Sequence, residues 1–597
     1  MSSQLIQERL TQLRQLMKNH QVDAWIVPSA DPHLSEYLPD YWQQRVWLSG
    51  FTGSVGTVIV TENFAGLWVD SRYWEQAKTQ LQDTGIELMK SGEPDVLNMD
   101  DWLAQHLPKE ARIGFNPFMM SLKQAEQLEE KLAPLSVSLF IDEDFIATLW
   151  QDRPTLPTQT VYVHDKTFVS QSRPEKLANV REMMRKEGAD WHFISSLDDI
   201  AWLFNLRGSD VEYNPVFLAH ALISQSYVVL FVPRGKISRE IEAELAGDGV
   251  LVKDYVSAGL MLGNLPKEQS LWIDPDRVAL ALGVTSCEKV IRKVNSTRLL
   301  KAEKTPQDIA HIRQAMEQDG AALCEFFAWF EAALERGDTI TELTIDEQIC
   351  QARARQAHHI SPSFATIAGF NANGAMPHYQ ATSENFAEIK GNGLLLIDSG
   401  GQYLNGTTDI TRVVPVGEVS AEQKRDYTAV LKGMIALSRA VFPRDYPSAL
   451  LDTLARTPLW QMGLDYGHGT GHGVGYFLNV HEGPQVIAHR AYRASHLEMK
   501  EGMVTSNEPG VYRAGKWGIR IENLVVTVAH QKTEFVDTLK FETLTLCPID
   551  TRCIDKHLMT QEEIDWLNTY HAEVLARLKP LVKGDALDWL VRRTQAI

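Results

Sequence analysis

The first half of the chain repeats one order of apolar and polar segments. Residues 23–54 and 189–210 each begin with an apolar stretch typical of a strand, continue through a Ser- and Asp-rich turn into a helical pattern, and reach a Gly-Ser turn. Strand-like runs follow at 56–70 and 221–233, and helical patterns follow those at 71–82 and 238–247. The sequence therefore predicts a duplicated α/β domain.

Prolines and a helix cap indicate where the domains end. Pro154 and Pro157 follow the first copy, and proline is poorly tolerated inside helices and central strands. Farther along, Thr305 is placed to cap a helix whose first position is Pro306. We therefore predict three domains, at residues 1–157, 158–304 and 305–597.

Both ends of the chain have the pattern of amphipathic helices. Residues 1–20 spread leucines among charged residues and lack the unbroken apolar core of a signal peptide. Near the C-terminus, Thr560 and Glu563 form a capping box before an apolar stripe, which predicts a packing helix. No stretch reaches the roughly 18 apolar residues of a membrane span, so we expect no membrane association.

Composition and charge narrow the range of partners. A chain of 597 residues is too long for one core, and a net charge of −19 with a pI near 5.4 argues against nucleic-acid binding. An acidic field suits a cationic ligand such as the free amine of a peptide. The cysteines are few, odd in number and scattered, which predicts reduced, buried thiols and a cytoplasmic location: Cys287, Cys324, Cys350, Cys547 and Cys553.

The stretch "GHGTGHGVG" at residues 467–475 raises the question of a zinc-binding helix, because His468 and His472 are four residues apart. Interior glycines cost a helix about 1 kcal/mol each relative to alanine, and five glycines occur in these nine residues. The stretch is therefore predicted to be loop or strand. Its glycines indicate that a ligand or metal comes close to the main chain.

Four carboxylates in the last domain lie at or near apolar strand patterns. Asp398 and Asp409 sit where strands end or begin, and an aspartate beside glycine is on its own more often a turn residue. Glu508 and Glu522 have apolar neighbours that predict buried strands, where an unpaired carboxylate is costly. Two divalent cations would balance these four charges, with a nitrogen from His472. An oxygen-rich set with one imidazole favours Mn²⁺, Co²⁺ or Fe²⁺.

Seven motifs follow one another in an order that resembles the pita-bread metallopeptidases, the group that contains methionine aminopeptidase, prolidase and aminopeptidase P. With the two preceding creatinase-like domains and the tail after residue 523, the chain looks like the long, three-domain, cytosolic-type aminopeptidase P of family M24. The resemblance implies two creatinase-like N-terminal α/β domains followed by a pita-bread (α+β) catalytic domain. The motifs are "NGAMPHY", "LIDSGG", "GTTDITR", "GTGHGVG", "VHEGP", "SNEPG" and "RIEN", within residues 373–523.

The resemblance also implies roles for individual residues. Asp398 would chelate one of two divalent ions, Asp409 and Glu522 would bridge them, and His472 and Glu508 would bind the other. The expected metal is Mn²⁺, with Co²⁺, Fe²⁺ or Zn²⁺ as alternatives. The residues expected to take part in catalysis around the substrate are His378, His468, His481 and Glu508.

The implied activity is removal of the N-terminal residue from peptides that have a free amine and proline in second position. A hydroxide bridging the two metals would attack the Xaa-Pro carbonyl, with Glu508 moving the proton and His481, or His378 as well, donating to the developing oxyanion. The resemblance and the apolar C-terminal helix together suggest a homodimer.

Three alternatives are compatible with parts of this pattern. A prolidase would act only on Xaa-Pro dipeptides, a creatinase-type enzyme would use the same fold without metals, and a non-catalytic peptide-binding homologue would be expected to lose ligands. The chain length argues against the first, and the complete ligand set argues against the other two. Four residues in the first domain are interpreted as core and surface, or alternatively as reaching a neighbouring subunit's site: Trp68, Asp70, Arg72 and Trp74.

Overall fold

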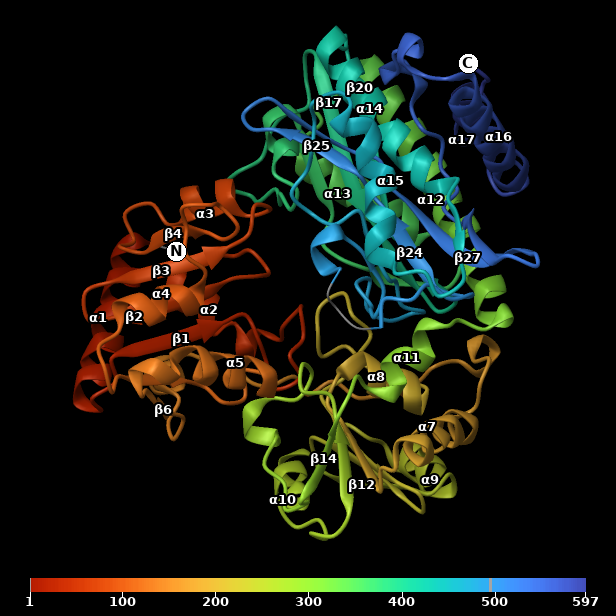
Figure 1. The fold of residues 1–597 in the computed structure, drawn as a ribbon. Coiled ribbons are helices and arrows are strands. Elements are labelled where there is room, and N and C mark those ends of the chain that lie inside the picture. The colour runs from red at the N-terminus through yellow and green to blue at the C-terminus, as the bar shows by residue number, and fades with distance from the viewer. Residues whose placement is uncertain (1, 493–495) are drawn as a thin grey trace. The chain divides into compact units, whose positions relative to one another are not determined.

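The computed structural model describes residues 2–492 and 496–597, which belong to two compact units (Figure 1). Unit 1 comprises Met1–His164 and Gln171–Arg298, and unit 2 comprises Asp165–Ser170 and Leu299–Ile597. The two repeated segments thus share unit 1. The boundaries at residues 157 and 304 stay predictions.

The first repeat forms a six-stranded mixed sheet with the order β4-β3-β2-β1-β5-β6. Strand β2 is antiparallel to both of its neighbours, and all other neighbouring pairs are parallel. The strands are β1 (Ala24–Pro28), β2 (Thr57–Thr61), β3 (Ala65–Val69), β4 (Glu87–Lys90), β5 (Arg112–Phe115) and β6 (Ser138–Phe140).

Alternate residues of β1 enter different cores, so helices cover both faces of this sheet. Trp25 packs with Leu10 of α1, whereas Ile26 packs with Trp102 of α4 and Leu128 of α5. The predicted N-terminal helix is confirmed as α1. The helices are α1 (Ser3–Asn19), α2 (Gln44–Ser49), α3 (Trp74–Gln80), α4 (Met99–His106), α5 (Leu122–Leu132) and α6 (Phe145–Leu149).

The second repeat forms a sheet of the same topology, with the order β12-β11-β10-β8-β13-β14. Its second strand, β10, is again antiparallel to both neighbours, while the other pairs are parallel. The predicted duplication is therefore confirmed. The strands of this sheet are β8 (Trp191–Ile194), β10 (His220–Ser224), β11 (Val228–Val232), β12 (Val250–Asp254), β13 (Ser270–Ile273) and β14 (Lys289–Arg292). Two short strands, β7 (Tyr162–Val163) and β9 (Leu206–Arg207), pair with each other separately. The helices are α7 (Arg173–Glu187), α8 (Leu197–Phe204), α9 (Arg239–Gly247), α10 (Ala258–Leu262) and α11 (Ser296–Ala302).

The polar and aromatic residues at the end of β3 belong to the core and surface of unit 1. Trp68 is buried and donates from Nε1 to the carbonyl of Leu97 over 2.9 Å. Arg72 pairs with Asp70 at 2.7 Å, and Trp74 donates to the carbonyl of Val69. These contacts agree with the core-and-surface interpretation, and a role at a neighbouring subunit's site stays a prediction.

Unit 2 is built around short sheets flanked by long helices (Figure 1). The first helix, α12, begins after Thr305, whose side chain accepts from the amide of Asp308 while Asp308 bonds back, so the predicted cap is confirmed as a full capping box. Helix α12 spans Pro306–Arg336. The other helices are α13 (Glu342–Ala354), α14 (Ala421–Ser438), α15 (Ser448–Trp460), α16 (Gln561–Leu578) and α17 (Gly584–Arg593).

Two of the sheets carry most of the candidate site. One has the order β16-β17-β20 and the other has the order β21-β28-β27-β24, while β25 and β26 form a separate hairpin. The strands are β15 (His359–Pro362), β16 (Ile367–Phe370), β17 (Gly393–Ser399), β18 (Gly401–Tyr403), β19 (Gly406–Thr407), β20 (Ile410–Val416), β21 (Val441–Pro443), β22 (Gly471–His472), β23 (Val486–Ile487), β24 (Val504–Asn507), β25 (Gly510–Arg513), β26 (Trp517–Arg520), β27 (Asn523–Lys532) and β28 (Asp537–Thr543).

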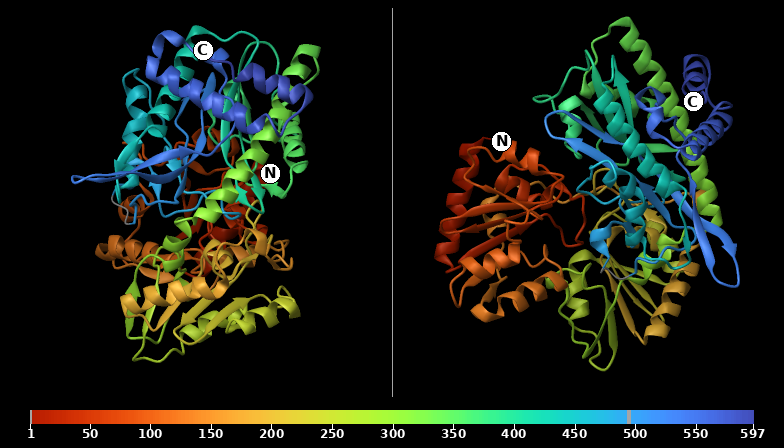
Figure 2. Two further views of the ribbon diagram at one scale, coloured as in Figure 1. Left: turned by 90° about the vertical axis from the view of Figure 1, so that its right-hand side faces the viewer. Right: turned by 45° about the horizontal axis from the view of Figure 1, so that its top comes forward.

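The C-terminal helices pack against the body of unit 2. Thr560 caps α16 through a capping box with Glu563, as predicted. Leu567 and Val574 of α16 and Trp589 of α17 join the main core, and both helices contact α12 (Figure 2). The apolar stripe of α16 is thus covered within the chain itself.

Two further predictions can be compared with the described residues. The five cysteines are free thiols, four of them buried and Cys350 half-buried. Among the helices that the structure describes, none is long and apolar enough to cross a membrane.

Candidate metal centre

The predicted ligands come from the ends of strands in unit 2. Asp398 is the sixth residue of β17 and is paired in register with Thr411 of β20, and Asp409 directly precedes β20. His472 ends the two-residue strand β22, and Glu508 directly follows β24. Strands far apart in the sequence therefore bring their ends to one place.

The apolar neighbours of Glu522 predict a buried strand at this residue, and the structure corrects this. The strand pattern is interrupted at Ile521 and Glu522, between β26 and β27. Up to Arg520 the chain pairs with β25, and from Asn523 it pairs with β24. The chain changes sheets at this break, and the amide of Glu522 donates to the carbonyl of Thr411 over 3.2 Å. The break points a buried carboxylate toward β20.

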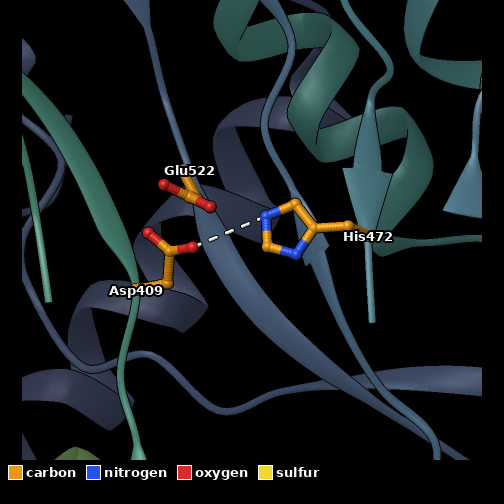
Figure 3. Close-up of side chains that lie close together, drawn as sticks. All are labelled: Asp409, His472 and Glu522. Carbon is orange, nitrogen blue, oxygen red and sulfur yellow. Dashed lines mark ion pairs between the residues drawn. The ribbon is translucent and has the colours of Figure 1, made fainter. Parts of the chain in front are cut away.

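Three of the predicted ligands form one cluster, shown in Figure 3. Asp409, His472 and Glu522 each offer a ligand atom, and these atoms lie within 4.8 Å of one another. Nε2 of His472 lies 3.5 Å from Oδ2 of Asp409 and 3.4 Å from Oε1 of Glu508. Glu508 therefore adjoins the cluster through the same imidazole nitrogen.

Asp398 forms a hydrogen bond with a residue outside the cluster of Asp409, His472 and Glu522. Its Oδ2 accepts from Nη2 of Arg520 over 2.5 Å, and both side chains are largely buried. Its Oδ1 is buried without a hydrogen-bond partner among the described residues, as is Oε1 of Glu522. Two carboxylate oxygens at the cluster are thus open to a cation.

Burial and mutual repulsion make the cluster electrostatically demanding. Burial, followed by the charge of Asp398, raises the pKa of Asp409 well above its ordinary value. Burial, followed by the charge of Asp409, does the same to the pKa of Glu522. Burial also raises the pKa of Glu508 to about 7, with the charge of Arg520 opposing that rise. These carboxylates therefore need positive charge beside them in order to ionise together.

The donor set fits divalent cations. It consists of carboxylate oxygens with one imidazole nitrogen, and two of the oxygens, Oδ1 of Asp398 and Oε1 of Glu522, have no hydrogen-bond partner among the described residues. The guanidinium of Arg520 pairs with the other oxygen of Asp398. Hydrogen bonds from neighbouring hydroxyls orient the ligands: Thr411 donates to Glu522 over 2.8 Å, and Ser506 donates to Glu508 over 3.2 Å.

The glycine-rich stretch 467–475 is not helical, so the zinc-helix hypothesis is excluded. A side chain at Gly471 would place its Cβ 2.0 Å from the carbonyl oxygen of Ser506, and one at Gly473 would place it 2.0 Å from that of Glu482. These glycines allow the strand to pack closely against its neighbours, which brings the imidazole of His472 to the carboxylates.

The histidines predicted to surround the substrate occupy different positions. The ring of His481 lies beside that of His472, with 4.3 Å between ring centroids. Nε2 of His468 lies 2.8 Å from the hydroxyl of Tyr512. His378 follows Pro377, whose carbonyl accepts from Arg520 over 3.3 Å. The catalytic roles of these residues stay predictions.

Sequence reasoning missed Arg520 and Tyr512. Arg520 donates from Nη1 to the hydroxyl of Tyr512 over 2.7 Å, and so connects Asp398 with Tyr512 and His468. A signal was present in the sequence, because Arg520 precedes the predicted ligand Glu522 by only two residues. A basic side chain therefore stood close in the sequence to a predicted metal ligand.

Comparison with known proteins agrees with the geometry. The model of metallopeptidase family M24 matches residues 310–529, and that of its C-terminal region matches 537–597. Two models of the creatinase/prolidase N-terminal domain match 9–143 and 152–308.

Full-length relatives share this order of domains. The chain is 41% identical to a probable Xaa-Pro aminopeptidase P of Laccaria bicolor, over 98% of this chain and 92% of that protein, and 37% identical to aminopeptidase P2 of Arabidopsis thaliana, over 99% and 89%. A crystal structure of X-prolyl aminopeptidase from Caenorhabditis elegans, described as a cytosolic enzyme with a di-nuclear active site, covers 100% of both chains with a TM-score of 0.95 and 34% identity.

Proposed function

The chain belongs to the aminopeptidase P group of metallopeptidase family M24, and we propose that it removes the N-terminal residue from peptides with proline in second position. The observation that carries this proposal is the buried cluster of Asp409, His472 and Glu522, with Glu508 beside it. A hydrolytic centre needs such a cluster, whereas a binding homologue has no need to maintain repelling carboxylates.

Two divalent cations would be held by five residues, with Asp409 and Glu522 shared between them. We propose Mn²⁺, because the donor set is rich in carboxylate oxygen and contains no thiolate. When bound, the cations supply the charge that lets all the carboxylates ionise, polarise the scissile carbonyl and lower the pKa of a water molecule. The five residues are Asp398, Asp409, His472, Glu508 and Glu522.

The chain's own side chains then handle protons and developing charge. Oε1 of Glu508 lies 3.4 Å from Nε2 of His472 and is placed to take a proton from the attacking water. The same carboxyl can return that proton to the prolyl nitrogen, which leaves as a secondary amine. We assign His481, with His378, to donate to the oxyanion, and His468 to contact the substrate, held by Tyr512.

Selection of the N-terminus follows from the charge of the centre. Four acidic side chains, those of Asp398, Asp409, Glu508 and Glu522, gather at this centre, so the free α-amino group of a peptide would be attracted to the same place as the cations. An acylated amine would lose this attraction.

We also propose a cytoplasmic homodimer. The cytosolic relative from Caenorhabditis elegans supports the location. The dimer rests on family resemblance alone, because the apolar stripe of α16 is covered within unit 2 and calls for no partner.

The test is metal-reconstituted hydrolysis of an Xaa-Pro-Yaa tripeptide set beside the matching Xaa-Pro dipeptide. We expect the tripeptide to be cleaved with the higher kcat/KM. Cleavage of the dipeptide alone would assign the chain as a prolidase-type dipeptidase, and cleavage of neither peptide would overturn the peptidase assignment.

A further inference from the structure

Glu482, the residue after His481, lies in a buried group of three charges. Its Oε1 accepts from Nζ of Lys304 over 3.1 Å, and its Oε2 lies 3.5 Å from Nζ of Lys301. All three side chains are at most 3% exposed. We call Lys301, Lys304 and Glu482 the ion triad.

The two lysines lie on the segment through which the chain enters unit 2. Lys301 is in the last turn of α11, and Lys304 precedes the cap of α12. The backbone of this segment is also held, because the amide of Lys304 donates to the carbonyl of Gly502 over 3.2 Å. The backbone that carries the two lysines is therefore held in place next to Gly502.

The backbone of Glu482 is held by the residue that follows β22. Its amide donates over 2.8 Å to the carbonyl of Gly473, the residue after His472. The side chain is closely confined as well: a Cβ at Gly475 would lie 2.8 Å from Oε2 of Glu482. His481 thus precedes a residue that is anchored through both its backbone and its carboxylate.

Stability alone does not explain the ion triad well. Burying ions costs several kcal/mol each, and well-packed apolar side chains often replace such groups without loss of stability. Here the carboxylate of Glu482 accepts from Lys304 and also lies 3.5 Å from the ammonium group of Lys301, so three ionisable groups are buried together. A directional constraint on the neighbouring loop accounts for this arrangement better than packing does.

We infer that Lys301 and Lys304, acting through Glu482, position His481 for the hydrolysis proposed above, so that Glu482 is a positioning residue. The inference rests on the proposed function. The anchor orients the backbone at Glu482 and with it the imidazole of His481, whose ring lies against that of His472. Loosening the anchor should affect the transition state more than substrate binding.

The main variant of the test removes the whole triad, so that no member of it stays buried without its partners. Replacing Glu482 alone would leave two buried ammonium groups and could unfold the protein, so the main variant is Lys301→Met/Lys304→Met/Glu482→Gln, which removes all three charges. A milder variant, Lys304→Met, leaves the pair between Lys301 and Glu482. The matched control is Glu303→Gln, because Glu303 lies on the same segment but pairs with Lys500 at the surface.

Steady-state kinetics on an Xaa-Pro-Yaa tripeptide, with metal content measured in parallel, give the first readout. A small misplacement of a catalytic group can cost about 100-fold in rate, so we expect kcat of the triple variant to fall by about that factor, with KM changed less than about threefold. Two metal ions per chain should be retained. Glu303→Gln should match the wild type.

A double-mutant cycle with His481→Ala separates positioning from general structure. If the triad acts through His481, adding the triple substitution to His481→Ala should lower kcat by less than about twofold. Equal losses in both backgrounds, or a triple variant with wild-type kcat, would overturn the inference. If the triple variant does not fold, Lys304→Met is measured in the same cycle, with an expected loss of about tenfold that His481→Ala abolishes. A wild type that cleaves no Xaa-Pro peptide would instead refute the proposed function.

Discussion

Arg520 and Asp398 form a buried ion pair in which Nη2 lies 2.5 Å from Oδ2. The same guanidinium donates to Tyr512, and the Tyr512 hydroxyl lies 2.8 Å from Nε2 of His468. Three contacts therefore connect a proposed metal ligand with a histidine proposed to touch the substrate. Arg520 also offsets part of the negative charge of the cluster.

Replacing Arg520 by methionine should lower kcat/KM by about two orders of magnitude or more. Removing one partner of a buried ion pair leaves the other charge uncompensated and typically costs about 3 to 5 kcal/mol of stability, so the side chains around it should shift. A misplacement of about 1 Å in a catalytic site can cost about 100-fold in rate. In this site the substitution removes the hydrogen bonds of Arg520 to Asp398 and to the hydroxyl of Tyr512. The measurement is hydrolysis of an Xaa-Pro-Yaa tripeptide, together with metal content.

Arg520→Lys is the matched control for this prediction. Lysine keeps the charge but lacks the planar fork that reaches Asp398, Tyr512 and Thr411 together. Its activity should lie between those of the methionine variant and the wild type. A methionine variant within threefold of the wild type would show that the connection has no role in turnover.

Asp409→Asn should abolish turnover with little loss of fold. The substitution is nearly isosteric but removes a charge that the cations require. Circular dichroism and thermal melting should show a folded chain, while hydrolysis in buffer saturated with metal stays at background. Asp588→Asn, on the exposed side of α17, provides the control and should be fully active. Retained turnover by Asp409→Asn would count against the proposed centre.

The duplicated fold could be predicted because local patterns carry it. The apolar runs that become β1 and β8 differ from the helical runs around them, and Thr305 and Thr560 each precede an acidic residue by three positions. The carboxylates were found in the same way, since each lies at or near an apolar strand. Patterns within some twenty residues were sufficient for these features.

Long-range pairings could not be predicted in this way. Arg520 and Asp398 are 122 residues apart, and Lys304 and Glu482 are 178 apart. The segment Asp165–Ser170 joins unit 2, where the carbonyl of Phe168 accepts from the hydroxyl of Tyr476 over 2.8 Å. No local periodicity encodes such contacts, because they depend on which strands and segments meet in the folded chain.

Crystals grown with Mn²⁺ should show two ions in unit 2 roughly 3.5 Å apart, the separation usual for paired-metal hydrolases. Anomalous scattering should place Asp409 and Glu522 within bonding distance of both ions. One ion at full occupancy, or a cysteine among the ligands, would contradict the proposed ligand set.

The stability of unit 1 should fall between about pH 6.5 and pH 4 because of His192. Burial against Trp272 lowers the pKa of His192 from 6.5 to about 4. The unfolded chain therefore binds this proton at a higher pH than the folded chain does, so acidification favours unfolding. The full shift corresponds to about 3 kcal/mol.

Chemical denaturation of wild type and His192→Gln at several pH values measures this effect. Between pH 7 and pH 4.5 the variant should lose about 2 to 3 kcal/mol less stability than the wild type, because glutamine does not titrate. Parallel pH profiles for the two proteins would mean that His192 titrates normally in the fold.

The central claim is proline-directed removal of one N-terminal residue, and the most direct test compares kcat/KM for Xaa-Pro-Yaa, Xaa-Ala-Yaa and N-acetyl-Xaa-Pro-Yaa. Proline lacks an amide hydrogen and fills a pocket shaped for its ring, whereas alanine leaves an unfilled space and an unpaired N–H. We expect alanine to reduce kcat/KM by roughly 30- to 1000-fold, or about 2 to 4 kcal/mol, and acetylation to abolish cleavage. Acetylated or alanine-containing peptides that are cut as fast as Xaa-Pro-Yaa would contradict the assignment, even with both metals in place.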